Sequence, residues 1–227
     1  MAAVEPGGQL RRLQAAAQAL DVPLAPAQAQ QLLDYLAQMQ RWNRTYNLTA
    51  LRDPEQMLVQ HVFDSLSVVA PLERELARQG RAAQACVMDV GSGGGLPGVV
   101  IAVCKPGWSV CCVDAVEKKT AFVRQMGGAL KLPNLSARHS RIEQLDPAAC
   151  DVVVSRAFAS LQDFSRLAGR HVRPGGWLLA MKGRDPVDET AALEQDGQWA
   201  VARSEPLHVP ELQAQRCLIW MCRKGNP

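Results

Sequence analysis

Short apolar runs alternate with helical segments along the chain from Cys86 onward. Such runs predict buried strands, and their alternation with helices favours an α/β fold with a doubly wound, largely parallel sheet. The predicted strands cover residues 86–90, 108–114, 135–139, 150–155, 176–182, 199–207 and 215–223. The predicted helices between them cover residues 97–104, 117–130, 160–172 and 187–195. Because only a short connection joins the last two strands, we expect them to pair antiparallel.

The residues before this alternation have a helical pattern. Apolar residues recur at helical spacing from Leu32 to Trp42 and predict a helix with one face in the core. Asp53 and Pro54 predict the start of another helix, with Asp53 as its N-cap. The patterns divide the chain into a weakly ordered, Ala- and Gln-rich tail with a weak helix around Leu10–Leu20 (residues 1–24), a helical extension (25–84) and the sheet domain (85–227).

A glycine-rich turn, residues 91–98, follows the first predicted strand and opens the next helix. Glycine tolerates positive φ and lets a ligand approach the backbone closely, and Pro97 suits the first turn of a helix. The N–H groups and the dipole at a helix start favour a polar, electron-rich ligand group. The turn therefore predicts a loop for a nucleotide-type cofactor, and a connector without a ligand is the alternative.

Two acidic residues bear on which cofactor this is. Asp89 lies near the end of the first strand, where a dinucleotide-binding strand is usually apolar. Asp114 ends the second strand, where a carboxylate would hold a ribose diol. The pattern of Asp89, Gly91 and Gly93 followed by Asp114 favours S-adenosylmethionine (SAM) over NAD.

The next two strand ends carry further candidates. Glu143 follows the third strand, where an acid and a free backbone N–H would suit the amine and ring nitrogen of adenine; a solvated loop acid is the alternative. Arg156 directly follows the apolar fourth strand, so its charge needs a partner or a ligand. We expect Arg156 to face the reacting centre.

The residues after the fourth strand also restrict the acceptor. An enzyme that methylates an exocyclic amine would carry an Asn/Asp-Pro-Pro-aromatic run there, and a cytosine-C5 enzyme a nucleophilic Cys. This chain has Ser155-Arg156-Ala157-Phe158 instead. That sequence fits an acceptor that is already nucleophilic, such as the lone pair of a ring nitrogen. We then expect no general base, and alignment of the reactants could supply about 7–11 kcal/mol of the rate acceleration.

The loop over residues 41–54 interleaves Trp and Tyr with basic residues, Asn and Thr, which suits contact with RNA; an ordinary helix connector is the alternative. His61 and Asp64 follow it, three residues apart on a predicted helix. We interpret them as a structural hydrogen-bonded pair, with a role facing the site as the alternative. No other His or Cys is placed to complete a metal site with them.

Composition sets outer limits on function. The chain has 227 residues, 48% of them hydrophobic and 21% charged, which suits a globular core. No apolar run could span a bilayer, and no signal-peptide pattern opens the sequence. The seven cysteines include no C-x-x-C pair, which favours reduced thiols in a cytoplasm. The net charge of +3 permits a nucleic-acid partner without requiring one.

Five motifs occur together in one order. They are Trp42-Asn43-x-x-Tyr46-Asn47-Leu48-Thr49, His61-x-x-Asp64-Ser65, Asp89-Val90-Gly91-Ser92-Gly93-Gly94-Gly95-Leu96-Pro97-Gly98, Ser155-Arg156-Ala157 and Lys182-Gly183. From about residue 30 to its end, the chain resembles the glucose-inhibited division protein B family. The resemblance implies a class I SAM-dependent methyltransferase fold: a Rossmann-like, mostly parallel seven-stranded sheet with an antiparallel last pair and an N-terminal helical extension.

The same resemblance implies an activity. The enzyme would transfer the methyl group of SAM, leaving S-adenosylhomocysteine, to guanine N7 in 16S rRNA or in the small ribosomal subunit. We further expect a cytoplasmic monomer that binds no metal and does not associate with a membrane.

Site residues carry over by position. The resemblance implies that Gly91 and Leu96 line the methionine and sulfonium end of SAM, and that Ile142 and Glu143 hold adenine. Arg156 would lie beside the methyl group. The other expected cofactor contacts are Asp89, Gly93 and, at the ribose, Asp114. Candidate RNA contacts are Arg44, Arg52 and Lys182, residues expected to shape the site are His61 and Asp64, and a basic pair typical of the family is Lys118-Lys119.

Two other functions stay open at this point. A SAM-dependent enzyme acting on a small molecule would methylate its substrate without RNA. A non-catalytic module of the same fold that binds RNA or the ribosome would bind RNA without taking up SAM.

Overall fold

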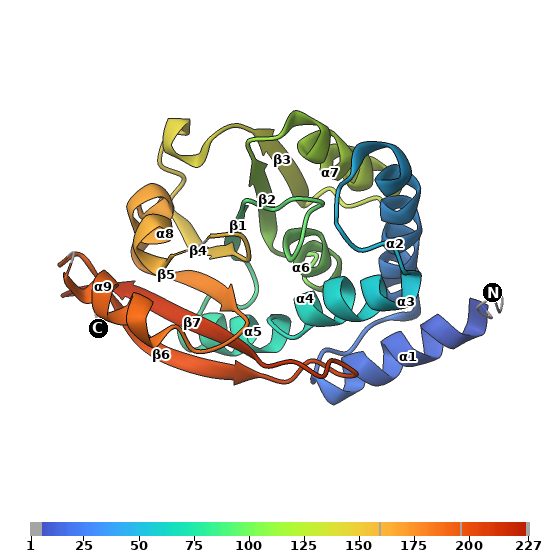
Figure 1. Cartoon of the computed structure of the whole chain (residues 1–227), viewed down its shortest axis with the longest axis horizontal. Helices are drawn as coiled ribbons and strands as arrows, with labels where there is room; N and C mark the ends of the chain where they lie inside the picture. Colours follow the sequence, from blue (N-terminus) through green and yellow to red (C-terminus); the bar gives the residue numbers. More distant parts are fainter. Residues whose placement is uncertain (1–5, 159, 196, 226–227) are drawn as a thin grey trace.

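The computed structural model describes residues 6–158, 160–195 and 197–225. It contains one seven-stranded sheet with the order β3-β2-β1-β4-β5-β7-β6 (Figure 1). The strands are β1 (Cys86–Val90), β2 (Ser109–Asp114), β3 (Leu135–His139), β4 (Cys150–Ser155), β5 (Val172–Lys182), β6 (Trp199–Leu207) and β7 (Arg216–Arg223). Neighbouring strands from β3 to β5 pair in parallel, and β7 runs antiparallel between β5 and β6. The predicted α/β fold and the antiparallel last pair are confirmed.

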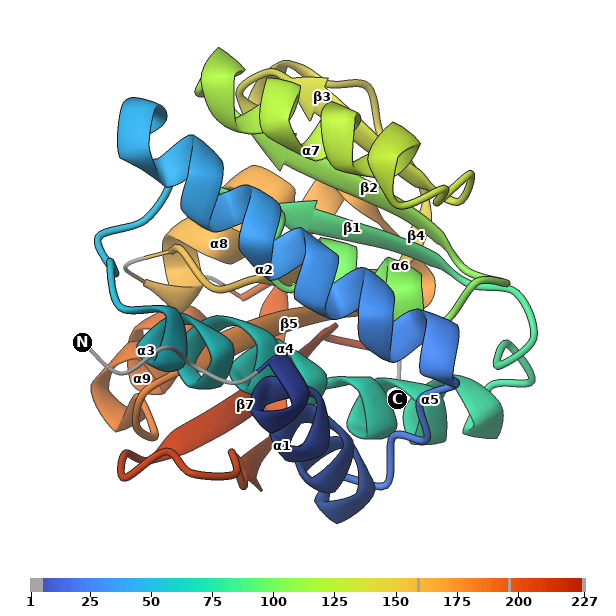
Figure 2. The same cartoon turned by 90° about the vertical axis from the view of Figure 1, so that its right-hand side faces the viewer.

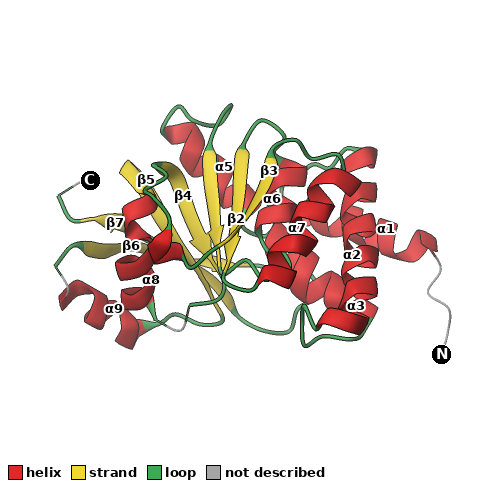
Figure 3. Cartoon of the chain, turned by 90° about the horizontal axis from the view of Figure 1, so that it is seen from above, coloured by secondary structure: helices red, strands yellow, loops and turns green. Residues whose placement is uncertain are grey.

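Helices cover both faces of this sheet (Figure 3). On one face lie α1 (Pro6–Ala19), α2 (Pro26–Tyr46), α3 (Pro54–Met57), α4 (Asp64–Leu66), α5 (Val69–Arg78), α6 (Gly98–Cys104) and α7 (Glu117–Ala129). On the other face lie α8 (Leu161–Ala168) and α9 (Val187–Gln195). None of the helices in the described ranges is both long and apolar enough to cross a membrane.

Alternation along the central strands explains the two helical layers. In β4, Val152 and Val154 belong to one buried cluster, whereas Val153 between them belongs to the other. Successive side chains of a strand point to opposite faces, so an all-apolar strand must be covered on both sides. The apolar runs that predict the strands therefore also require the doubly wound arrangement.

The N-terminal segment is more firmly packed than its composition predicts. Where the sequence predicts a weakly ordered tail, helix α1 buries Leu13, Ala16 and Ala17. Arg12 of this helix forms ion pairs with Glu55 and Glu211. The same buried cluster runs from α1 into the sheet, so the boundary near residue 84 is not marked by a break in the core and stays a prediction.

Helix α2 has the expected core-facing stripe and reaches the glycine-rich turn. Leu32, Tyr35, Leu36 and Met39 are buried on one side of it. The Tyr35 hydroxyl donates a hydrogen bond to the carbonyl of Gly94 at 2.6 Å. Figure 2 shows α2 crossing in front of α6 beside β1 and β2. The helical extension thus supports the turn that the sequence marks as the cofactor loop.

The segment from residue 54 to 66 departs from a regular α-helix. The predicted start is confirmed, because Asp53 accepts a hydrogen bond from the Glu55 N–H at 3.1 Å and Pro54 begins α3. The helix then widens into a π-helical segment, η1 (Leu58–Phe63), before α4 begins at Asp64. A π-helix closes hydrogen bonds across five residues, and such segments are frequent at functional sites.

Tyr35→Phe tests the link between α2 and the turn. Removing the hydroxyl leaves the buried Gly94 carbonyl without this donor, and we expect a loss of about 1–3 kcal/mol in the free energy of unfolding. Urea denaturation measures it, with the exposed Tyr46→Phe as the matched control, which should change stability by less than about 0.5 kcal/mol. Equal stability of the two variants would show that the hydrogen bond contributes nothing.

Candidate functional site

The glycine-rich turn folds as its residues require. Gly91, Gly93 and Gly95 have φ values of 68°, 58° and 92°, a region that side chains with a Cβ rarely adopt. The N–H groups of Gly91 and Ser92 both donate to the Val113 carbonyl, at 2.8 and 3.1 Å, which ties the turn to β2. Helix α6 begins at Gly98, so Pro97 is its N-cap residue and not part of its first turn.

Asp89 supports the turn from beneath. Its side chain is completely buried, and Oδ2 accepts a hydrogen bond from the Gly98 N–H at 2.8 Å. A Cβ on Gly98 would lie 2.9 Å from that oxygen, so only glycine allows this approach. Oδ1 has no hydrogen-bond partner among the described residues. Burial raises the pKa of Asp89 to about 7.

Asp114 supports the same turn from the neighbouring strand. Its Oδ2 accepts from the Gly93 N–H at 2.9 Å, and its Oδ1 accepts from the Val116 N–H at 2.8 Å. Lys119 Nζ lies 3.9 Å from Oδ2. Each carboxylate oxygen has two lone pairs, so Asp114 can hold the turn and still accept hydrogen bonds from the hydroxyl groups of a ligand.

A cavity of about 220 Å³, which we call the turn cavity, opens above the turn. Its walls combine three predicted cofactor contacts, Gly91, Gly93 and Leu96, with His61 and Arg156. The remaining lining residues are Met39, Leu48, Thr49, Ser92, Gly94 and Ala157. The extension therefore supplies one wall of the cavity, while Asp89 stays beneath the turn.

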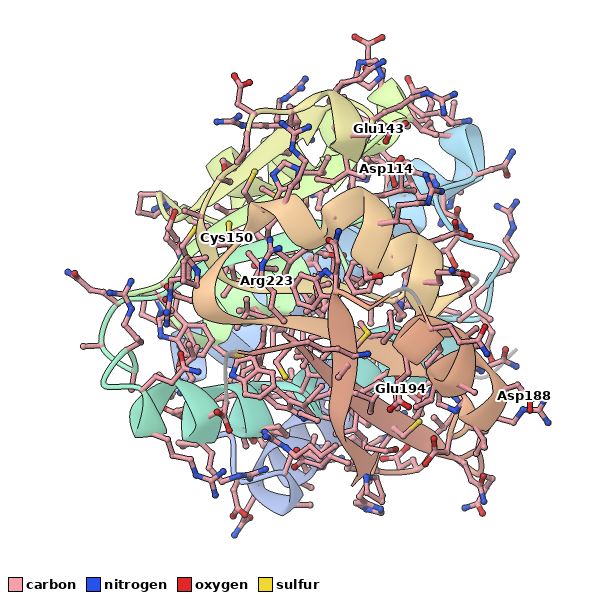
Figure 4. All side chains as sticks on the ribbon, turned by 90° about the vertical axis from the view of Figure 1, so that its left-hand side faces the viewer. Asp114, Glu143, Cys150, Asp188, Glu194 and Arg223 are labelled. Carbon is pink, nitrogen blue, oxygen red and sulfur yellow. The ribbon has the colours of Figure 1, made fainter. Side chains whose placement is uncertain are left out.

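The predicted adenine contacts lie farther along the same sheet edge. Ile142 and Glu143 form a 3₁₀ turn, η2 (Ile142–Gln144), after β3. Ile142 is buried and Glu143 is exposed. The Ser140 N–H donates to the Asp114 carbonyl at 3.2 Å, which joins this turn to the end of β2. Figure 4 shows Asp114 and Glu143 at the same end of the molecule.

His61 does not pair with Asp64, so the predicted hydrogen-bonded pair is wrong. Its Nδ1–H donates to the Gln60 carbonyl at 3.1 Å, which leaves Nε2 to accept from the Thr49 hydroxyl at 2.9 Å. Burial and, second to it, the positive charge of Arg156 lower the pKa of His61 to about 4. His61 is therefore neutral at pH 7, with both ring nitrogens engaged.

Arg156 has the protein partner that its position required. Its Nη1 donates to the Gln60 carbonyl and to Asp64 Oδ2, both at 3.2 Å. The other oxygen of Asp64 accepts from Arg216 Nε at 2.9 Å. Sequence reasoning missed Arg216, which is 152 residues from Asp64. The only signal for Arg216 is its place at the start of the antiparallel strand β7. The pairing of β7 with β5 places Cys217 opposite Lys182 and so brings Arg216 to this edge of the sheet.

A second cavity, the basic cavity, adjoins the first. It measures about 390 Å³ and shares His61 and Arg156 with the turn cavity. Its other lining residues are Leu51, Gln60, Asp64, Met181, Lys182, Gly183 and Arg216. Lys182 donates to the Phe158 carbonyl and pairs with Glu189 at 2.8 Å. A larger hollow of about 500 Å³, lined by α1 and the loop that follows it, contains none of the predicted site residues.

The candidate RNA residues around α2 differ in their availability. Arg44 is exposed, whereas Arg52 donates to the Asn43 carbonyl and to Asn47 Oδ1, at 2.8 and 2.6 Å. Arg52 therefore braces the loop after α2. Trp42 packs on Tyr46 and on Phe122, with ring centroids 4.9 and 5.4 Å apart. No group of three or more side chains suited to a metal ion occurs in the part of the chain that the structure describes.

Comparisons with known proteins agree with this geometry. The family model described as rRNA small subunit methyltransferase G matches residues 28–219. A protein named ribosomal RNA small subunit methyltransferase G from Bordetella pertussis is 68% identical over 222 residues, covering 97% of this chain and 96% of the relative. One of the same name from Leptothrix cholodnii is 52% identical over 209 residues, covering 92% and 93%.

Solved structures with similar folds include methyltransferases. A SAM-dependent methyltransferase from Aquifex aeolicus matches with a TM-score of 0.52 at 16% identity, covering 77% of this chain and 96% of that one. A ribosomal protein L11 methylase from Lactobacillus delbrueckii matches with a TM-score of 0.51 at 14% identity, covering 69% and 78%. These likenesses establish the fold.

The pKa values of His61 and Asp89 predict opposing effects of pH on stability. Asp89 keeps its proton up to about pH 7 when folded but loses it near 3.8 when unfolded, so its contribution falls as pH rises between these values. His61 is neutral down to about pH 4 when folded but protonates near 6.5 when unfolded, so its contribution falls as pH falls.

Asp89→Asn isolates the first effect. Relative to the wild type, the variant should gain about 3–4 kcal/mol in unfolding free energy as pH rises from 4 to 7.5. Urea denaturation of both proteins at several pH values gives the difference, in which all other groups cancel. A difference that does not change with pH would mean that Asp89 ionises normally in the folded protein.

Proposed function

Because the chain belongs to the rRNA small subunit methyltransferase G family, we propose that it transfers the methyl group of SAM to N7 of a guanine in 16S rRNA. The observation that carries the proposal is the pair of adjoining cavities with a common wall of His61 and Arg156. One cavity is formed by the glycine-rich turn and suits the donor. The other is lined by basic residues and suits a nucleotide. With 16S rRNA as its acceptor, the protein would act in the cytoplasm.

The residues around the turn cavity fit SAM. A Cβ on Gly91 would lie 2.9 Å from Ala157 Cβ, so only glycine lets the turn pack this closely against the segment after β4. Gly91 and Leu96 would contact the methionine end, Asp114 the ribose hydroxyls, and Ile142 with Glu143 the adenine. Asp89 would act from beneath the turn, through its hydrogen bond from the Gly98 N–H. When bound, SAM supplies an electrophilic methyl group on a positively charged sulfur.

The protein residues supply alignment and not proton transfer. A guanine N7 lone pair has no proton to lose when it is methylated. His61, the titratable side chain common to both cavities, has one nitrogen donating to Gln60 and the other accepting from Thr49. Arg156 is fixed by Gln60 and Asp64 at the junction of the cavities. Holding the reactants in line can contribute about 7–11 kcal/mol.

RNA would approach over the loop after α2 and the open side of the basic cavity. Arg44 is exposed there and can contact a phosphate, whereas Arg52 would act mainly by holding the loop. Lys182, held by Glu189, would contribute charge at the cavity wall. The substrate is naked 16S rRNA or the assembled small subunit.

The direct test of this function is methyl transfer to rRNA. Unmodified 16S rRNA or small subunits are incubated with the protein and labelled SAM, and nuclease digests are analysed by mass spectrometry. We expect one 7-methylguanosine per rRNA molecule. Methylation of a small molecule without RNA would favour the small-molecule enzyme, and RNA binding without uptake of SAM would favour a binding module.

Asp114→Ala tests the ribose contact. We expect SAM affinity to fall about ten- to a hundredfold, because hydrogen bonds to a charged group are worth roughly 1.5–3 kcal/mol and about 1.4 kcal/mol is tenfold. Isothermal calorimetry measures the affinity, and Asp114→Asn, which keeps one acceptor oxygen, should lose less. Unchanged affinity in the Ala variant would mean that the ribose is held elsewhere.

A further inference from the structure

Asp64 is a buried carboxylate shared by two arginines from distant parts of the chain. Asp64 is the first residue of α4 and is 2% exposed. Oδ2 accepts from Arg156 Nη1 at 3.2 Å and Oδ1 from Arg216 Nε at 2.9 Å. Removing a carboxylate from water is costly unless it is paired, so this residue holds both guanidinium groups in fixed positions. Both arginines line the basic cavity.

The two guanidinium groups keep further donors for a ligand. Arg216 uses Nε for Asp64 and Nη1 for the Gln215 carbonyl, which leaves Nη2. Arg156 uses Nη1 for its two partners, which leaves Nε and Nη2. Planar guanidinium groups with paired N–H donors match the oxygens of phosphate groups. Arg156 and Arg216 share the carboxylate of Asp64, and Lys182 is paired with Glu189, so the arginine pair keeps an excess of positive charge and the cavity suits an anion.

We propose that the basic cavity binds the backbone phosphate attached to the target guanosine, with Arg216 contacting the phosphate and Asp64 acting as a positioning residue. The inference rests on the proposed function, because it assumes that an RNA guanosine is the acceptor. The cavity volume of about 390 Å³ lies in the range of small-ligand sites. Its common wall with the turn cavity lets a base extend from the phosphate toward the methyl group.

The chemistry of the acceptor argues for a phosphate contact and against a contact to the base edge. Arginine most often recognises guanine through O6 and N7 together. An arginine in that arrangement would occupy the N7 lone pair, which must remain free to attack the methyl group. A phosphate contact fixes the position of the nucleotide without covering the reacting atom.

The experiment compares Arg216→Gln with the wild type in steady-state methyl transfer to unmodified 16S rRNA. We expect the KM for RNA to rise about tenfold with kcat changed by less than about threefold, because a charge-assisted phosphate contact is lost. The affinity for SAM, measured by calorimetry, should stay unchanged. The matched control is Arg166→Gln, which removes an exposed arginine of α8 and should leave all three quantities unchanged.

The salt dependence of RNA binding separates a phosphate contact from a general structural effect. Removing one contact should reduce the slope of log affinity against log salt concentration by about 0.7–0.9. Arg216→Lys keeps the charge and should keep the wild-type slope, with weaker binding because the paired donors are lost. Asp64→Asn keeps both arginines. It should raise the KM for RNA but change the slope of log affinity against log salt concentration by less than the value of about 0.7–0.9 for one lost contact.

The outcomes distinguish the two proposals. If the wild type methylates rRNA while Arg216→Gln behaves like Arg166→Gln, the phosphate site is wrong and the function stands. If Arg216→Gln weakens SAM binding and leaves RNA binding unchanged, the cavity holds the carboxylate of the cofactor and the proposal is overturned. If the wild type binds RNA with the expected slopes but transfers no methyl group, the cavity binds an RNA phosphate, whereas the proposed function fails and with it the assignment of that phosphate to a target guanosine.

Discussion

Two carboxylates hold the glycine-rich turn in the shape that the rest of the site depends on. Asp89 accepts the Gly98 N–H from beneath, and Asp114 accepts the Gly93 N–H from the neighbouring strand. From Gly91 to Gly95 the turn has no side chain larger than that of serine, so these hydrogen bonds and the positive φ of its glycines define its path. This arrangement buries Asp89, whose Oδ1 has no hydrogen-bond partner in the described part of the chain and whose pKa is raised.

The helical extension completes the site that the sheet begins. Tyr35 bonds to the turn at Gly94, and Met39, Leu48 and Thr49 form the opposite wall of the turn cavity. The π-helical segment presents His61 toward Thr49, and the first residue after it, Asp64, joins the two arginines. The sheet alone would leave the donor site open on this side. The extension is therefore part of the candidate site and not an accessory to it.

The sequence predicts the fold well because local patterns carry the information. The central strands are apolar runs whose side chains alternate between the two faces of the sheet, and Asp53 and the glycines have roles that follow from their own chemistry. Arg156 next to an apolar strand predicts a need for a partner, and Asp64 meets that need. What fails depends on tertiary context. The π-helical segment changes which residues share a face, so His61 and Asp64 diverge to different partners, and Arg216 reaches Asp64 only through the pairing of β5 with β7.

The claim at the centre of this account is that the carboxylate-held turn seats the methyl donor. A crystal structure of the full chain with SAM or S-adenosylhomocysteine tests it most directly. The account predicts ribose hydroxyls on Asp114, the methionine end against Gly91 and Leu96, and the Gly93 N–H still bonded to Asp114. A nucleoside bound away from the turn, or a turn that releases Asp114 when the donor binds, would contradict it.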